Sequence, residues 1–468
     1  MQIKVPGGSF TGAIEGEIVR FRNVPYGILK ARFTEAEMAN NVGDCDCTRQ
    51  GPLCPQDKPY RDSYLSVAEE DVIEFEEVYD EMNCLNLMIT MPKSVGTAKL
   101  PVVVWVHGGG NSAGTAYRGV NDPKDWVQRG IDIGKPFIVV TIQYRVHFFG
   151  FLPFKGKGNF GQYDQLLATD WVHKYIGYFG GDKDRVTVAG QSSGSFCVWN
   201  VSCRPDAKFK QAAYLSGSLK GTSTRSLEEY EELTKKICNL LNCTEDELQT
   251  CPWHDLVRAY KELGIQVLMQ CDDGHFKPKG EWHKPPQNMH RVIISDCIED
   301  GQFFTDGLQE GQLVGMLQQL IPESVQKVYP LKTDHQAIRL LTDYIFAAGN
   351  HSVDCEMQQT IKVFRQLFDA TNPVDPSRGN IHMVELLYLL HAYKVKPEYL
   401  PLVHRVQDLW IDLIYYEDPW DPKQEFLRVE STTVVEPREN LSKYRAIDKF
   451  HVLDNEVVRK SRNTISGW

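Results

Sequence analysis

The sequence contains no apolar stretch long enough to cross a membrane, no run of basic residues and no internal repeat. A membrane-spanning helix needs about 20 consecutive apolar residues, and none of the stretches in these 468 residues reaches that length. Nucleic-acid-binding proteins carry a basic face, whereas this chain has a net charge of -11 and no five consecutive basic residues. We therefore expect neither a membrane span nor nucleic acid as a partner.

The sequence also has no zinc-type pair of cysteines and no apolar signal segment at its start. The cysteine spacing fits no metal site, so we expect no metal and no cofactor. The first residues lack the apolar core of a signal peptide, which predicts a cytoplasmic protein. The twelve cysteines favour a secreted or endoplasmic-reticulum location instead, if the start is truncated. The sequons at Asn200, Asn242, Asn350 and Asn440 matter only in that case.

The hydrophobic fraction of 42% is enough for a sizeable core. Short runs rich in Val and Ile are typical of strands that are buried on both faces. Such runs occur at Pro101–Val106, Phe137–Tyr144, Arg185–Ala189, Gln211–Leu215 and Arg291–Ser295. Helical spacing separates them, as in the stretch from about 163 to 178, which ends at Gly180-Gly181. This alternation predicts an α/β fold with a large, mostly parallel sheet flanked by helices.

Two later segments, at about 222–289 and 308–370, have helical and charged patterns. We interpret them as helical insertions over the carboxyl-terminal edge of the sheet, because no linker rich in Pro, Gly or Ser divides the chain. The tail carries one amphipathic helix around 406–416, followed by strand-like stretches. The sequence thus predicts a single domain over residues 1–468.

The pattern Gly-x-Ser-x-Gly occurs twice, around Ser112 and around Ser192. A nucleophile elbow needs a strand directly before this pattern and a helix directly after it. The run Arg185–Ala189 precedes the pattern around Ser192, and an apolar helix start follows it, whereas His107, Gly108 and Gly109 separate the other pattern from its strand. We therefore predict Ser192 as the nucleophile and keep Ser112 as the alternative.

The run His107-Gly108-Gly109-Gly110 directly follows an expected buried strand. Acyl transfer passes through a tetrahedral oxyanion that needs preorganised N–H donors. Glycines can turn their N–H groups into a cavity without side-chain obstruction, and this pattern serves that purpose in lipases and esterases. We assign the oxyanion donors to Gly109 and Gly110, with the N–H of Ser193 as the third.

A series of further motifs resembles one family. They are Phe21–Tyr26, Gln50–Gln56, Cys84–Leu87, the Gly158–Gly161 element that continues to Asp164-Gln165, Trp171-Val172, Phe179–Asp182 and Arg185–Thr187. Over most of residues 10–305 the chain resembles the type-B carboxylesterase and cholinesterase-like family. The resemblance implies the α/β-hydrolase fold and the hydrolysis of carboxylic esters.

The resemblance also implies the remaining site residues. The family's acid position is held here by Asp300 rather than the usual Glu, with Glu299 as the runner-up, and the base position by His382, with His391 as its rival. The order Ser, Asp, His along the chain is that of α/β-hydrolases. Ser216 matches a family serine that supports the triad. Cys54 with Cys84, and Cys243 with Cys251, match positions of family disulfides.

The predicted protein is therefore a serine hydrolase that cleaves a small-molecule ester through an acyl-enzyme intermediate. Gln191 and Ser193 depart from the family's usual residues beside the nucleophile. Gln191 resembles juvenile hormone esterases, so a hormone-specific member is one alternative. The other alternative is a non-catalytic binding or adhesion protein, although all three triad positions hold competent residues.

Overall fold

A computed structural model describes residues 1–57, 62–217, 219 and 224–453 of the chain. Its central sheet consists of β3 (Ala13–Glu15), β4 (Ile18–Pro25), β8 (Asn86–Pro92), β9 (Leu100–Val106), β10 (Ile138–Ile142), β11 (Gly181–Gln191), β12 (Gln211–Leu215), β13 (Arg291–Cys297), β14 (Lys362–Phe368), β15 (Glu425–Val429) and β16 (Thr433–Pro437). The 11 strands follow the order β16-β15-β14-β13-β12-β11-β9-β10-β8-β4-β3. In this order, the strands from β15 to β10, with β9 among them, pair in parallel. Antiparallel strands extend both edges of the sheet.

Two small sheets accompany the central one near the amino terminus. One pairs β1 (Gln2–Val5), β2 (Gly8–Thr11) and β7 (Gly43–Asp46), and the other pairs β5 (Gly27–Ile28) with β6 (Glu37–Met38).

Strand β9 illustrates why the apolar runs form the centre of the sheet. Val102 and Val104 pack into a core cluster on one face, and Val103 and Trp105 pack into a second cluster on the other. Because successive side chains of a strand point to opposite faces, only a continuous apolar run can be buried on both. Each such side chain contributes about 1.5–3 kcal/mol to folding when it is fully buried.

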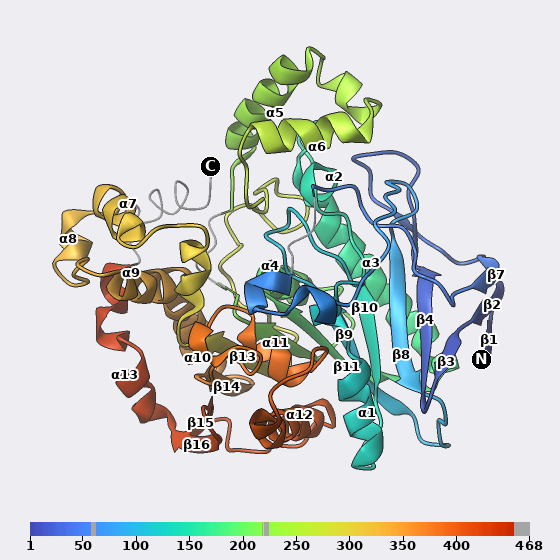
Figure 1. Cartoon of the computed structure of the whole chain (residues 1–468). Helices are drawn as coiled ribbons and strands as arrows, with labels where there is room; N and C mark the ends of the chain where they lie inside the picture. Colours follow the sequence, from blue (N-terminus) through green and yellow to red (C-terminus); the bar gives the residue numbers. More distant parts are fainter. Residues whose placement is uncertain (58–61, 218, 220–223, 454–468) are drawn as a thin grey trace.

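Helices cover both faces of the sheet (Figure 1). The helices are α1 (Lys124–Asp132), α2 (His147–Phe151), α3 (Phe160–Tyr175), α4 (Ser193–Ser202), α5 (Leu227–Leu241), α6 (Trp253–Glu262), α7 (Gln312–Leu320), α8 (Glu323–Gln326), α9 (Asp334–Leu341), α10 (Ala348–Met357), α11 (Val384–Leu389), α12 (Leu400–Ile414) and α13 (Leu441–Tyr444). Helices α3 and α4 pack on one face, whereas α1, α11 and α12 pack on the other. Among the described residues, no helix is both long and apolar enough to cross a membrane.

The five apolar runs predicted as strands correspond to β9, β10, β11, β12 and β13. The mostly parallel α/β sheet predicted from them is confirmed. Strand β14 differs from expectation, because its residues 362–368 fall within the second segment expected to be helical. Strand β14 is buried except for its first residue, Lys362. Arg365 and Gln366 interrupt its apolar run, so the sequence does not show the pattern of a buried strand.

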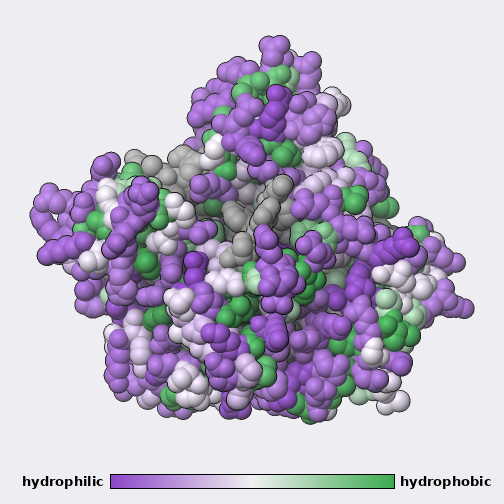
Figure 2. All heavy atoms as spheres, viewed as in Figure 1, coloured by the Kyte–Doolittle hydropathy of each residue, from purple (hydrophilic) through white to green (hydrophobic). Residues whose placement is uncertain are grey.

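The helical segments project from the sheet and meet the loops at the ends of its strands. Helix α5 begins with a capping box in which Ser226 and Glu229 satisfy each other's backbone N–H groups. Helix α6 contacts the loop after β9 through Tyr260, whose hydroxyl donates to Ser112. Figure 2 shows that the lobe formed by α5 and α6 is covered mainly by hydrophilic residues, which suits amphipathic helices that face solvent.

A buried ion pair links the end of β10 to helix α3. The Arg145 guanidinium donates to both carboxylate oxygens of Asp164, at 2.8 and 2.7 Å. Both side chains are almost completely buried. Because a charge buried without its partner is costly, this pair fixes α3 against the sheet.

We predict that Asp164→Ala lowers the free energy of unfolding by about 3–5 kcal/mol, because the Arg145 charge stays buried without a partner. Urea denaturation of the purified protein measures the change. Asp206→Ala is the matched control, since the Arg204–Asp206 pair lies at the surface and such pairs contribute at most about 1 kcal/mol. Equal losses in the two variants would contradict the structural role of the buried pair.

Candidate active site

Ser192 occupies the single residue between the end of β11 and the start of α4. Its backbone has φ 55° and ψ -126°, a conformation that costs a residue with a side chain about 1–3 kcal/mol. Such a turn is expected of a nucleophile elbow, because it pushes the serine side chain out of the strand and away from the helix. The sequence expectation of a strand before Ser192 and a helix after it agrees with this geometry.

The two glycines of the elbow are required by close backbone contacts. A Cβ atom on Gly190 would lie 2.5 Å from the carbonyl oxygen of Gly194. A Cβ atom on Gly194 would lie 2.3 Å from the carbonyl oxygen of Val106 and 2.6 Å from that of His107. The elbow therefore packs directly onto the end of β9, where only glycine fits.

Ser112, the serine of the other pattern, has a different setting. It lies in the loop after β9, where its backbone N–H donates to the carbonyl of Gly109. Its hydroxyl donates to the carbonyl of Gly110 and accepts from Tyr260 at 2.5 Å. Ser112 has neither an adjoining strand end nor a helix start, and its hydroxyl is bonded on both sides.

The glycine-rich loop after β9 lies against the amino terminus of α4. Gly109 and Gly110 have φ values of 122° and 62°, which favour glycine. Ser193 is the first residue of α4, so its N–H has no acceptor within the helix. The Ser193 hydroxyl accepts from the N–H of Asn111 at 3.2 Å. The glycine-rich loop and the start of α4, which carry the three expected oxyanion donors, are therefore in contact.

Asn111 holds this loop from several directions. Its side-chain amide donates to the carbonyl of Leu268 at 2.7 Å, and its own carbonyl accepts from the N–H of His147. The N–H of Leu268 donates in turn to the carbonyl of Gly110. The two Leu268 contacts come from the segment after α6, so the first helical insertion supports the glycine loop, and the His147 contact comes from the start of α2.

Asp300 and His382, which are 82 residues apart, meet in the interior. Nδ1 of His382 lies 2.7 Å from Oδ1 of Asp300, and both side chains are buried. The other carboxylate oxygen of Asp300 accepts from the N–H of Cys297 at 2.9 Å. This arrangement fixes a proton on Nδ1 and leaves Nε2 of the ring as the basic nitrogen.

The two rival residues lie elsewhere. The carboxylate of Glu299 is 3.3 Å from Nε2 of His335. The backbone N–H of Glu299 donates to the side chain of Asn380. The ring of His391 lies 3.5 Å from the carboxylate of Asp125, at the start of α1. Burial lowers the pKa of His391 from its usual value.

The surroundings of the His382 ring include contacts that the sequence did not reveal. Phe303 and Phe346 flank the ring, with centroid distances of 5.4 and 5.3 Å. The amide nitrogen of Gln191, the residue next to Ser192, lies 3.3 Å from Nε2 of His382. The elbow and the histidine are therefore neighbours, although Gln191 was singled out only as a departure from a family pattern.

A second group of buried residues contacts Cys297, whose N–H donates to Asp300. The thiol of Cys297 donates to Oε2 of Glu385 at 3.0 Å, and the hydroxyl of Ser216 donates to the sulfur of Cys297 at 3.6 Å. Burial, and then the negative charge of Asp300, raise the pKa of the Glu385 carboxyl above its usual value. Among the described residues, the Ser216 hydroxyl thus contacts Cys297, which binds Asp300, rather than Asp300 or His382 directly.

All twelve cysteines are free thiols in the structure. Cys54 and Cys84, expected to form a disulfide, are buried neighbours whose thiols hydrogen-bond, which raises the pKa of Cys84. Cys243, expected to pair with Cys251, has Cys238 within hydrogen-bond reach instead. Neither of the two expected disulfides is therefore confirmed. Within the described residues, no group of three His, Cys, Asp or Glu side chains is arranged to hold a metal.

Comparisons with known proteins give consistent matches over most of the chain. The sequence model of the Carboxylesterase family matches residues 1–310. Lipase 3 of Yarrowia lipolytica (strain CLIB 122 / E 150) is 29% identical over 463 residues, which cover 94% of this chain and 93% of that protein. Para-nitrobenzyl esterase of Bacillus subtilis (strain 168) is 25% identical over 446 residues, covering 86% and 87%. A solved PNB esterase structure has a TM-score of 0.79 at 22% identity, covering 96% of this chain and 99% of its own.

We predict that Gly194→Ala disrupts the elbow, because the added Cβ meets two backbone oxygens that cannot move independently. Overpacking of this kind costs about 1–3 kcal/mol, which a urea titration measures. Gly315→Ala is the control, since its Cβ enters open space on helix α7 and alanine stabilises a helix interior by up to about 1 kcal/mol. A neutral Gly194→Ala variant would show that the close contact with β9 is not required.

Proposed function

The chain belongs to the carboxylesterase family, and from this premise we propose that Ser192, His382 and Asp300 hydrolyse carboxylic esters through an acyl-enzyme intermediate. The substrate is a small-molecule ester. The hydrogen bond between His382 and Asp300 is the observation that carries the proposal. It joins a buried carboxylate to an imidazole that contacts Gln191, the residue before Ser192 in the strained elbow.

In the first step, Nε2 of His382 takes the proton of the Ser192 hydroxyl as its oxygen attacks the ester carbonyl. Asp300 fixes the imidazole tautomer and stabilises the imidazolium that forms. The structure holds the amide of Gln191 at Nε2, which supports an unprotonated nitrogen there, because an amide N–H donates to it. Catalytic hydrogen bonds of a free enzyme often shorten only when substrate binds.

The tetrahedral oxyanion is held by the N–H groups of Gly109, Gly110 and Ser193. One such donor contributes about 10²–10³-fold to turnover. His382 then gives its proton to the leaving alcohol, and the acyl group stays on Ser192. In the second half, His382 takes a proton from a water molecule, whose oxygen attacks the acyl carbonyl. The bond from that carbonyl to Oγ of Ser192 then breaks, His382 returns its proton to this oxygen, and the carboxylic acid leaves.

We predict that Ser192→Ala loses about 10⁶-fold in kcat on p-nitrophenyl butyrate, because the nucleophile is removed. A fluorophosphonate probe, followed by intact-mass measurement, should add to the wild type and leave Ser192→Ala unmodified. Ser112→Ala is the matched control and should label like the wild type. Labelling of Ser192→Ala but not of Ser112→Ala would move the nucleophile to the other pattern, and labelling of no variant, wild type included, would favour a binding protein.

We predict that Asp300→Asn lowers kcat by about 10⁴-fold, because an amide favours the wrong imidazole tautomer while it keeps the shape of the side chain. Glu299→Gln should retain wild-type kcat, since the Glu299 carboxylate faces His335. Steady-state rates of the two variants on the same ester decide between the carboxylates. The assignment of the acid is wrong if Glu299→Gln carries the larger loss.

A further inference from the structure

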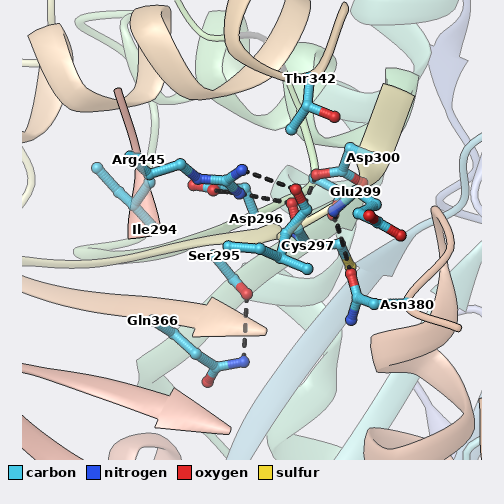
Figure 3. Close-up of polar contacts among 12 residues, drawn as sticks. Ile294, Ser295, Asp296, Cys297, Glu299, Asp300, Thr342, Gln366, Asn380 and Arg445 are labelled. Atoms are coloured by element: carbon cyan, nitrogen blue, oxygen red, sulfur yellow. Dashed lines mark hydrogen bonds and ion pairs between the residues drawn. The ribbon is translucent and has the colours of Figure 1, made fainter. Parts of the chain in front are cut away.

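A buried ionic cluster lies directly beside the loop that carries Asp300 (Figure 3). At its centre is Asp296, near the end of β13, which is completely buried. Its carboxylate pairs with the guanidinium of Arg365, from the neighbouring strand β14, and with that of Arg445, which follows α13. Both arginines are buried as well, with side chains 2% and 4% exposed.

Arg445 binds the backbone of the turn as well as the carboxylate. One guanidinium nitrogen donates to the carbonyl of Cys297 and to Asp296, both at 2.5 Å. Another donates to the carbonyl of Ile298 at 2.9 Å. Arg445 therefore spans three consecutive residues with a planar group, which a flexible ammonium could not do.

The same turn orients the proposed acid. The N–H of Cys297 donates to Oδ2 of Asp300, and the other oxygen of that carboxylate meets His382. Cys297 thus contacts Arg445 through its carbonyl and Asp300 through its N–H. In Figure 3, Arg445 reaches the turn from one side and Asp300 lies on the other.

We propose that Arg445 is a positioning residue for ester hydrolysis, which holds the turn 296–298 so that the Asp300 carboxylate meets His382. The inference rests on the proposed function, since it requires Asp300 to be the acid. The Asp300 side chain is one methylene shorter than the Glu that is usual at this position. A carboxylate on a short side chain depends on its backbone for placement, and Arg445 fixes that backbone.

The charges of the cluster support the same role. Burial disfavours the charged form of Arg445, but the carboxylates of Asp296, Asp343 and Asp300 raise its pKa overall. Asp296 lies between two guanidinium groups and neutralises only one of them. Arg445 therefore keeps its charge beside the turn that carries Asp300.

The test compares Arg445→Met with Arg438→Met. Arg438 lies in the same carboxyl-terminal segment and likewise joins a buried carboxylate, Asp354, to backbone carbonyls. Within the described residues, the Arg438 guanidinium binds Asp354, Val363 and Pro422, and none of these lies in the turn 296–298. Both variants should lower the urea midpoint, because each removes an arginine that pairs with a buried Asp. Only Arg445→Met should lower kcat on p-nitrophenyl butyrate, by about 10²-fold, with KM unchanged.

A coupling measurement separates positioning from general damage. If Arg445 acts through Asp300, adding Arg445→Met to Asp300→Asn should cause no further loss of kcat. A full additional loss in the double variant would overturn the inference. If Arg445→Met does not fold, Arg445→Lys takes its place, because a lysine keeps the charge beside Asp296 but reaches fewer of the three acceptors. Its smaller loss of kcat should likewise vanish in the Asp300→Asn background.

The failure of this inference differs from the failure of the proposed function. Wild-type kcat in Arg445→Met, together with a large loss in Asp300→Asn, would overturn the role of Arg445 and leave the triad intact. Wild-type kcat in Asp300→Asn would overturn the triad assignment and the inference with it. An equal loss of kcat in Arg438→Met would show that any buried arginine of this segment matters, and would also overturn the specific role.

Discussion

The proposed acid, Asp300, meets His382 beside a short turn at the end of β13, residues 296–298, which contacts from several segments hold in place. Asp300 reaches His382 with one oxygen and the N–H of Cys297 with the other. The N–H of the next residue, Gly301, donates to Thr342 in the second helical insertion. The carboxyl-terminal segment contributes Arg445 on the opposite side of the turn. Because a carboxylate must lie within hydrogen-bond reach of the imidazole to fix its tautomer, these supports determine whether the base can work.

Ser192, the proposed nucleophile, is held by close steric contacts of its elbow rather than by polar ones. Gly194 packs so closely on the end of β9, and Gly190 so closely on Gly194, that neither glycine has room for a Cβ atom. The same approach puts the N–H of Ser193 beside the glycine-rich loop, which the Ser193 hydroxyl joins through Asn111. A rigid, close contact between two buried strands thus supplies the geometry on one side of the site, whereas hydrogen bonds to a turn supply it on the other.

The difference between close packing and hydrogen bonds from distant segments explains what the sequence could predict. The strands and the elbow follow from local patterns, since an apolar run or a glycine pattern states its own structural requirement. The acid and base were reached only by resemblance, and the contacts of His382 with Phe303, Phe346 and Gln191 were missed. Such contacts join residues far apart in the chain and leave no local pattern. Strand β14 was obscured for a related reason, because its arginine belongs to a buried ion pair that the sequence does not reveal.

The distribution of the site along the chain has a further consequence. The family match covers residues 1–310 and so includes the proposed nucleophile, the proposed oxyanion loop and the proposed acid. The base, its aromatic neighbour Phe346 and Arg445 all come later. Asp300 is therefore the point at which the matched part of the chain depends on the rest, since both its catalytic partner and its backbone support come from there. A relative that keeps the matched residues but changes the carboxyl-terminal segment needs another group to hold this turn, because a buried turn keeps unsatisfied carbonyls only at a cost of about 1–3 kcal/mol each.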